Sequence, residues 1–486
     1  MTTDTFLWHD YETFGADTRR DRPCQFAAIR TDHELAPVGE PEMLYCRPTL
    51  DMLPAPEACL ITGITPQMAD ERGVPEYEFA RRIAEIMSVP GTCSVGYNNF
   101  RFDDEVTRFM FWRNFLDPYR REYANGNSRF DLIDVLRLTR ALRPEGLTWF
   151  DREDGTPGFR LEDLAAANGL ETGDAHDALA DVRNTLELAR RVRAAQPKLW
   201  NWALRLRDKA TVDGLLSKRE VMLHASARFP ASIHCIAPVL PLFRHPQIAS
   251  QWLVWNLRVD PTEYADLDTE MLSDLYWTPA ADLPEDLERL PVKWVRTNRC
   301  PMIAPTGVLD DAAAERTGID LARAGRLAER LGRAEPLIAR LLEIFGAPRE
   351  PGAGAVDGDA DSALYAGFVP RTDRSLADRI ADLPPEDVAE RVNRDPSPFT
   401  DARLNDLLLR FAGRHAPGAL NPDLAAAWED WRRRRLVDDP DLAPIRLDEY
   451  RLRVEALAEQ HPDRGDLFRA LREWPDRLGL SPGAAS

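Results

Sequence analysis

The sequence predicts an α/β protein that continues into a β-rich region and then into a region of helices only. Short runs of strand-type residues alternate with amphipathic helical patterns over residues 1–195. β-rich stretches follow over about 200–350 and end in a helical pattern. Beyond residue 361 the pattern is helical only, with breaks at Pro or Gly. We therefore expect an α/β fold followed by two further domains.

The first region begins with three strands before its first helix, which predicts a meander at the start of the sheet. Strands are expected over Phe6–Tyr11, Gln25–Thr31, Met43–Arg47 and Thr92–Tyr97. Helices are expected over Glu76–Ser88, Phe102–Phe115, Asp131–Leu142, Leu161–Asn168 and Asp177–Ala194.

The rest of the chain divides at a stretch with linker composition. Strands are expected over Glu220–Ala227, Ile233–Leu242, Trp252–Val259 and Val292–Thr297, and helices over Leu321–Leu331 and Leu337–Phe345. Gly, Ala and Asp dominate residues 351–361, which favours a linker. The expected domains are therefore 1–197, 198–350 and 362–478, with 351–361 between the last two.

Bulk properties exclude several classes of protein. The net charge of −19 argues against non-specific coating of duplex DNA, although a local basic groove stays possible. No run of 18 apolar residues could span a membrane, and the N-terminus lacks a secretory pattern, so we expect a cytoplasmic protein. The six cysteines form no CxxC pair, which favours reduced, buried thiols. Nothing resembles a coiled coil, so we expect a monomer.

Two carboxylates one residue apart, Asp10 and Glu12, end the first predicted strand. In a strand, residues i and i+2 point to the same face, so both carboxylates project side by side. Each charge raises the cost of ionising the other, and a cation between them removes that cost. Oxygen ligands suit a hard ion, Mg²⁺ or Mn²⁺, and this is a first indication of a nuclease.

Further acidic groups follow at two other predicted junctions. Asp103 or Asp104 caps or opens the helix that follows the strand at Thr92–Tyr97. In His176-Asp177-Ala178-Leu179-Ala180-Asp181, Asp177 is a plausible N-cap, so Asp181 lies about one turn into its helix. Four carboxylates can hold two divalent ions ~3.5–4 Å apart. A neutral histidine, with a pKa of ~6.5, can take a proton from metal-bound water.

The ordered set resembles the DEDDh family of 3′→5′ exonucleases, with D-x-E first, N-x-x-F-D next and H-x-A-x-x-D last. That pattern places its Asp directly after Phe, which selects Asp103 over Asp104. By this resemblance Asp10, Glu12 and Asp181 ligate one Mg²⁺, and Asp10 shares a second. It also implies that Asp103 helps to hold the second ion through water and that His176 is the general base.

The resemblance to the bacterial exodeoxyribonuclease I family extends over nearly the whole chain. Its motifs are His9–Gly15, Leu60–Pro66, Gly96–Asn99, Arg101–Arg108, Ala141–Gly146, Ala175–Ala178, Pro291–Lys293, Asn298–Pro301, Leu364–Tyr365 and Gly367–Phe368. This family has an RNase H-like nuclease domain with a mixed sheet, an SH3-like β-barrel domain and an α-helical C-terminal domain. The resemblance implies processive 3′→5′ degradation of single-stranded DNA to 5′-mononucleotides, in DNA repair and recombination. It also implies binding of the acidic tail of single-stranded DNA-binding protein, in a basic pocket near Arg143 or in the second domain.

Arginines offer a track for the phosphates of a strand. Residues 101–160 contain eleven Arg and eleven Asp or Glu, so this stretch is neutral in an acidic chain. Arg108, Arg113, Arg137, Arg143 and Arg160 are the candidates for substrate binding, together with Glu12. Several of them could equally pair with neighbouring acids.

Two other functions remain open at this point. The same five catalytic residues would serve an exoribonuclease or oligoribonuclease, because discrimination of the 2′-hydroxyl depends on shape. A non-catalytic repair scaffold is the alternative outside the enzyme class. The two extra domains favour the exodeoxyribonuclease.

Overall fold

The computed structural model describes residues 4–170, 177–279, 282–284, 288–346 and 359–480. The chain forms two compact units, and the first is discontinuous in sequence. It consists of Met1–Ser128, Thr172–Arg183 and Glu350–Ser486, whereas the second consists of Arg129–Glu171 and Asn184–Arg349. No described helix is both long and apolar enough to cross a membrane.

The first sheet has five strands in the order β3-β2-β1-β4-β5. The strands are β1 (Thr5–Thr13), β2 (Pro23–Thr31), β3 (Glu42–Tyr45), β4 (Thr92–Gly96) and β5 (Ser128–Asp131). β1 pairs antiparallel with β2 and parallel with β4, so the sheet is mixed. The expected meander of three strands is confirmed.

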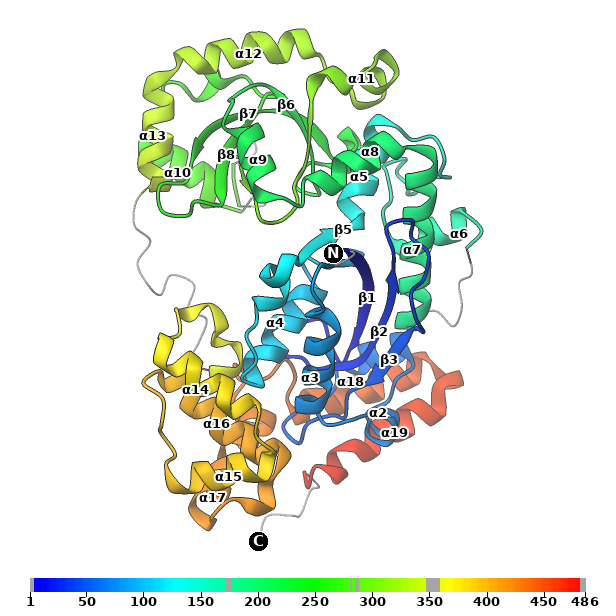
Figure 1. Cartoon of the computed structure of the whole chain (residues 1–486), viewed down its shortest axis with the longest axis vertical. Coiled ribbons are helices and arrows are strands. Elements are labelled where there is room, and N and C mark those ends of the chain that lie inside the picture. Colours follow the sequence, from blue (N-terminus) through cyan, green and yellow to red (C-terminus); the bar gives the residue numbers. More distant parts are fainter. Residues whose placement is uncertain (1–3, 171–176, 280–281, 285–287, 347–358, 481–486) are drawn as a thin grey trace. The chain divides into compact units, whose positions relative to one another are not determined.

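Two helices cover one face of this sheet in the first unit (Figure 1). They are α3 (Glu76–Met87) and α4 (Asp103–Arg113), both close to their predicted ranges. Phe79 of α3 and Met110 of α4 share a core with Tyr11 and Phe26 of the sheet. Two short helices, α1 (Pro56–Thr62) and α2 (Pro66–Arg72), were not predicted; seven residues with Pro at the first position give too little periodic pattern.

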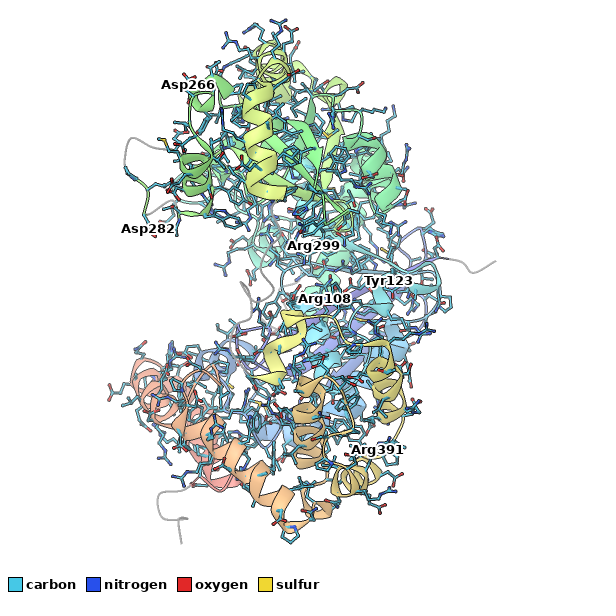
Figure 2. All side chains as sticks on the ribbon, turned by 90° about the vertical axis from the view of Figure 1, so that its left-hand side faces the viewer. Arg108, Tyr123, Asp266, Asp282, Arg299 and Arg391 are labelled. Atoms are coloured by element: carbon cyan, nitrogen blue, oxygen red, sulfur yellow. The ribbon has the colours of Figure 1, made fainter. Side chains whose placement is uncertain are left out.

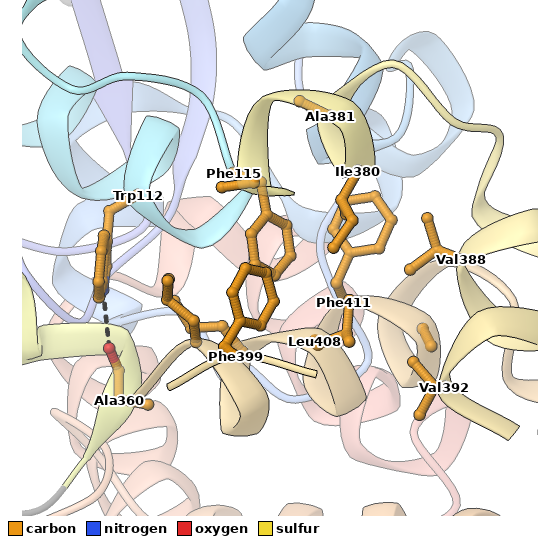
Figure 3. Close-up of a cluster of buried hydrophobic side chains, with 14 of the residues drawn as sticks. Trp112, Phe115, Ala360, Ile380, Ala381, Val388, Val392, Phe399, Leu408 and Phe411 are labelled. Carbon is orange, nitrogen blue, oxygen red and sulfur yellow. Dashed lines mark hydrogen bonds between the residues drawn. The ribbon is translucent and has the colours of Figure 1, made fainter. Parts of the chain in front are cut away.

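The C-terminal part of the first unit is helical, as expected. It contains the 3₁₀ segment η6 (Ala360–Ala366) and helices α14 (Arg371–Ala381), α15 (Pro385–Arg394), α16 (Ala402–His415), α17 (Pro422–Arg433), α18 (Leu447–Gln460) and α19 (Gly465–Arg477). Phe115, which follows α4, stacks on Phe399 with ring centroids 5.9 Å apart (Figure 3). The Trp112 indole N–H donates to the Ala360 carbonyl at 2.8 Å (Figure 3). These helices therefore share a core with α4, which covers the first sheet.

A buried ion network also joins the C-terminal helices to the N-terminal segment of the first unit. Arg414 of α16 donates to Asp51 at 2.7 Å and also to Asp361, and both carboxylates are fully buried. Arg22 of the sheet region donates to Asp361 at 2.9 Å. At the end of the predicted linker, Asp359 and Asp361 are buried and ion-paired. The rest of that stretch, up to residue 358, lies outside the described residues.

The second unit contains an antiparallel sheet in the order β10-β6-β7-β8-β9. Its strands are β6 (Met222–Ala225), β7 (Ile236–Arg244), β8 (Gln251–Asn256), β9 (Val292–Arg296) and β10 (Met302–Pro305). The first four were predicted, whereas β10 has only four residues and lies between prolines, which hides it from pattern analysis.

The second unit also contains eight helices within the described residues, of which α12 and α13 pack against this sheet (Figure 1). They are α5 (Leu132–Leu142), α6 (Leu161–Ala167), α8 (Pro197–Arg205), α9 (Lys209–Leu216), α10 (Thr269–Trp277), α11 (Asp311–Thr317), α12 (Leu321–Arg333) and α13 (Glu335–Gly346). The core joins Trp255 of β8 to Leu327 of α12 and Leu341 of α13. Helix α7 (Ala178–Ala195) begins in the first unit and continues into the second.

Candidate active site

The two carboxylates of β1 project from the face opposite its buried aromatic residues. His9 and Tyr11 are 2% and 3% exposed, and Tyr11 packs in the core under α3 and α4. Because strand residues alternate, Asp10 and Glu12 lie together on the other face, where both are partly exposed. The pairing with β2 shifts by one residue after Glu12, so a bulge ends the regular ladder beside this pair.

Helix α7 brings a third carboxylate to this face. Asp181 lies in its first turn. One carboxylate oxygen each from Asp10, Glu12 and Asp181 lies within 4.8 Å of the other two. Two oxygens on opposite sides of Mg²⁺ are roughly 4 Å apart, so small movements would fit all three around one hard cation.

Helix α4 supplies the fourth carboxylate. Asp103 opens this helix, and its Oδ1 accepts a hydrogen bond from the Tyr11 backbone N–H at 3.1 Å. This bond holds the Asp103 carboxylate beside the strand that carries Asp10 and Glu12, and its charge acts on both of them. The neighbouring Asp104 is fully buried and accepts from Arg121 at 2.6 Å, so its charge is already neutralised.

Burial and mutual repulsion perturb the carboxylates of β1. Burial raises the pKa of Asp10 well above its usual range, and the carboxylates of Asp103 and Glu12 add to the shift. Burial, followed by repulsion from Asp181 and Asp103, raises the pKa of Glu12 to about 8. A bound cation reverses this cost, because it stabilises the charged forms. The donor set therefore fits a hard metal ion.

One residue near the site was not predicted from the sequence. Gln25 of β2 lies opposite Glu12 in the ladder. Its side-chain amide donates to Asp177 at 3.3 Å, and its Oε1 accepts from the Ala178 backbone N–H at 3.3 Å. Gln25 thus attaches the start of α7 to the sheet, near the turn that carries Asp181. A glutamine within a predicted strand gives no local signal of this role. The predicted general base, His176, lies outside the described residues.

Two of the predicted phosphate-binding arginines have structural partners instead. Arg113 is 1% exposed and donates to Glu76 at 2.7 Å, which does not favour the predicted DNA contact, and that contact stays a prediction. Arg108 is also buried, and each of its three guanidinium nitrogens donates to a protein oxygen. Two of them hold Glu122 at 2.7 and 2.9 Å, so its contact with DNA is likewise not favoured and stays a prediction. Arg108 lies beside the segment that carries Tyr365, as Figure 2 shows, and donates to that hydroxyl at 3.2 Å.

The other three arginines belong to the second unit. Arg143 pairs with Asp310 at 2.9 Å and donates to the Val308 carbonyl. Arg137 pairs with Asp134 at 2.5 Å on α5. Arg160 is largely exposed, and its Nε lies 3.3 Å from Glu162. None of these contacts tests whether Arg137, Arg143 and Arg160 bind substrate, so this role stays a prediction for all three.

The fold and the acidic cluster define an exonuclease, and comparison with known proteins agrees. An exonuclease family model matches residues 7–189, a model of the exonuclease I SH3-like domain matches 207–347, and a model of the exonuclease I C-terminal domain matches 358–478. The chain is 38% identical to exodeoxyribonuclease I of Escherichia coli, over 98% of each chain. It is 36% identical to exodeoxyribonuclease I of Haemophilus influenzae, over 96% of this chain and 97% of that protein.

Solved structures give the same result over the full length. Exonuclease I from Methylocaldum szegediense superposes with a TM-score of 0.91 at 47% identity, covering 98% of this chain and 100% of that chain. E. coli exonuclease I in complex with a dA16 oligonucleotide superposes with a TM-score of 0.90 at 37% identity, with the same coverage. The chain belongs to the exodeoxyribonuclease I family. This membership confirms the predicted family and fold class, with a nuclease domain, an SH3-like domain and a helical C-terminal domain.

Proposed function

We propose that this protein is a metal-dependent exonuclease that degrades single-stranded DNA processively from the 3′ end and releases 5′-mononucleotides. The observation that carries the proposal is the convergence of Asp10, Glu12 and Asp181 in one acidic cluster. Relatives of the same length support the substrate, because E. coli exonuclease I was crystallised with single-stranded oligonucleotides. A further structure of exonuclease I is described as suggesting how processivity is achieved.

We assign Asp10, Glu12 and Asp181 to metal binding, with Asp10 shared between two ions. Two Mg²⁺ ions, for which Mn²⁺ could substitute, would supply an activated water and stabilise the charge on the scissile phosphate. Asp103 would hold a water molecule of the second ion, and its bond to Tyr11 N–H keeps its carboxylate in place. His176 would accept the proton of the attacking water. The carboxylate of Asp104 is paired with Arg121. This supports Asp103, and not Asp104, as the metal-site carboxylate of the N-x-x-F-D motif.

One assay tests the function and separates it from its alternatives. DNA and RNA oligonucleotides are labelled and incubated with the full-length protein, with and without Mg²⁺. We expect nucleotide-by-nucleotide loss of DNA from the 3′ end, only with metal. Asp181→Ala should abolish it, whereas Glu187→Ala, which removes an exposed carboxylate from the same helix, should not. Faster loss of RNA would instead indicate a ribonuclease, and binding without product would indicate a scaffold.

The protein should also bind the acidic tail of single-stranded DNA-binding protein. A homologous exonuclease I was crystallised in complex with the C-terminal tail of that protein. Arg143 lies at the end of α5, partly exposed, and its only described carboxylate partner is the exposed Asp310. We propose that a tail carboxylate competes with Asp310 for this guanidinium. Stimulation of digestion by the partner, lost when its tail is removed, tests the interaction.

We propose domains at 1–197, 198–350 and 362–478, acting as a monomer in the cytoplasm. The six free cysteines support a reducing compartment, since all are buried and none is paired. Sedimentation of the purified protein would test the monomer.

A further inference from the structure

Three consecutive carboxylates, Asp103, Asp104 and Glu105, open helix α4, and the catalytic proposal uses only the first of them. Acidic side chains in the first turn of a helix interact favourably with its dipole, but three together also repel one another. Successive helix residues point about 100° apart, so the three carboxylates face three directions. The partners of the second and third carboxylates therefore help to set the orientation of the turn that carries Asp103.

Arg121 holds the carboxylate directly after Asp103. Its guanidinium donates to Asp104 at 2.6 Å, and the two side chains are 1% and 0% exposed. Arg121 lies in the 3₁₀ segment η1 (Arg120–Glu122). Because solvent screens a buried ion pair only weakly, this contact attaches η1 firmly to the first turn of α4.

Arg108 holds the third carboxylate. Its Nη1 donates to Glu105 at 2.7 Å, while its Nε and Nη2 hold Glu122. The Glu122 carboxylate also lies 4.0 Å from the Arg121 guanidinium. Negative and positive side chains thus alternate along one network, which consists of Asp104, Arg121, Glu122, Arg108 and Glu105.

The network ends on a residue from the C-terminal part of the first unit. The Tyr365 hydroxyl donates to Glu105 at 2.6 Å and accepts from Arg108 at 3.2 Å. The Tyr365 ring meets the Phe109 ring of α4 edge-on, with the ring centroids 5.4 Å apart. A single hydroxyl therefore joins the C-terminal part to the acidic turn of α4.

The segment that carries this hydroxyl is itself held in place. Tyr365 lies in η6, and the Trp112 indole N–H of α4 donates to the Ala360 carbonyl at the start of that segment. Arg403 of α16 donates to the Ala363 carbonyl at 2.6 Å. The position of the Tyr365 hydroxyl relative to Glu105 is therefore set by the fold.

We propose that Tyr365 and Arg121 are positioning residues for the second metal ion. They hold the carboxylates of Glu105 and Asp104, and this keeps both charges away from Asp103 and fixes its turn. The inference rests on the proposed function, which assigns Asp103 to that ion through a water molecule. Removal of a group that orients a metal-binding residue commonly lowers metal affinity by about 10–100-fold.

The first test uses full-length Tyr365→Phe, which removes the hydroxyl and keeps the ring against Phe109. Tyr365 is 44% exposed, so the fold should survive. The matched control is Tyr119→Phe. The Tyr119 ring also lies against Arg108, at 5.2 Å, but its hydroxyl forms no hydrogen bond within the described part of the chain.

Two measurements that need no catalysis compare these variants. Mn²⁺ is titrated into each protein, and the free ion is measured by electron paramagnetic resonance. Binding of fluorescent oligo(dT) is measured by anisotropy in EDTA. Tyr365→Phe should bind the weaker of two Mn²⁺ ions about tenfold less tightly than Tyr119→Phe does, and both should bind oligo(dT) equally.

Equal Mn²⁺ titrations of the two variants overturn the proposal, and so does a wild type that binds a single Mn²⁺ ion. Weaker oligo(dT) binding with unchanged Mn²⁺ binding also overturns it, because Tyr365 would then act on the strand and not on the metal site. A wild type that binds two Mn²⁺ ions but digests no DNA overturns the proposed function instead. In that case the Mn²⁺ comparison still tests the positioning role.

The other side of Asp103 is tested with Arg121→Gln and Arg121→Lys. Arg121→Gln removes the charge beside Asp104 and should weaken the same Mn²⁺ site about tenfold, whereas Arg121→Lys keeps the charge and should restore most of the affinity. Arg121→Gln with the Mn²⁺ affinity of the wild type would exclude Arg121 from this role. Circular dichroism checks the fold, and Tyr365→Phe decides the proposal if Arg121→Gln is unfolded.

Discussion

Arg414 and Asp51 form a buried ion pair at 2.7 Å between positions 363 residues apart in the chain. The pair joins the C-terminal helices to the nuclease part of the first unit. Asp361 and Arg22 extend it into a network, so neither charge of the pair is left alone in the interior.

Removing one partner of this pair should be strongly destabilising. Arg414→Met leaves the Asp51 carboxylate buried with too little positive charge, which costs about 3–5 kcal/mol. Denaturation by urea, followed by circular dichroism, measures the decrease in stability. The control is Arg472→Gln, which breaks an exposed pair with Glu455 and should cost less than about 1 kcal/mol. Equal destabilisation of the two variants would contradict a structural role for the buried pair.

Stability should fall as the pH falls from about 6.5 to about 4, and His415 should cause part of that fall. Burial lowers the pKa of His415 from 6.5 to about 4. Between these values the unfolded chain binds a proton that the folded protein does not, so acid favours unfolding. The ring lies between Tyr77 and Phe411, so phenylalanine can replace it.

His415→Phe should flatten the pH dependence of unfolding in this window by roughly 3 kcal/mol. Urea titrations of both proteins at several pH values measure the difference. Because burial also lowers the pKa of His9 and of His224, both proteins keep a residual slope of the same sign. An unchanged slope in the variant would show that His415 does not titrate as expected.

The metal-free protein should be stabilised by neutralising Glu12. Its pKa is raised from 4.5 to about 8, so above pH 4.5 the unfolded chain loses this proton more readily than the folded protein does. That difference destabilises the fold increasingly as the pH rises to about 8. Glu12→Gln should therefore raise the melting temperature in EDTA, and more at pH 8 than at pH 5.

The same variant should respond little to metal. Mg²⁺ should stabilise the wild type, because it binds the folded state, and should stabilise Glu12→Gln much less. Scanning fluorimetry with Mg²⁺ and with EDTA measures both effects, and Glu187→Gln serves as the control for the removal of an exposed carboxylate. If Glu12→Gln is less stable than the wild type in EDTA, the burial and repulsion of the Glu12 carboxylate do not destabilise the metal-free fold.

Gln25 should matter for activity although it ligates no proposed metal. Gln25→Ala removes both contacts to the start of α7, and the looser position of Asp181 should lower activity by about 10–100-fold. The effect should be accompanied by a higher Mg²⁺ requirement. Tyr45→Phe removes only the other partner of the Gln25 amide, at 3.0 Å, and should leave activity near that of the wild type. Equal activity of both variants would exclude this positioning role.

The sequence predicted most regular elements because their patterns are local. The alternation in β1 places Asp10 and Glu12 on one face, and the spacing in α7 places Asp181 in its first turn. The ion pairs of Arg108 and Arg113 were not predictable, because their partners Glu122 and Glu76 are chosen by the fold and not by spacing. An arginine in a sequence resembles a surface residue, whether or not an acid from another segment buries it.

The burial of Asp361 and Arg414 has a consequence for synthesis on the ribosome. Asp51, Arg22 and Glu76 emerge early, but their network is complete only when α16 has been translated. At ~5–20 residues per second, the nuclease segment waits many seconds for these partners. The second unit, encoded mostly between the first and last segments of the first unit, has its own core. The buried ion network of the first unit is thus encoded in part at the start of the chain and completed only near its end, when Arg414 of α16 is added.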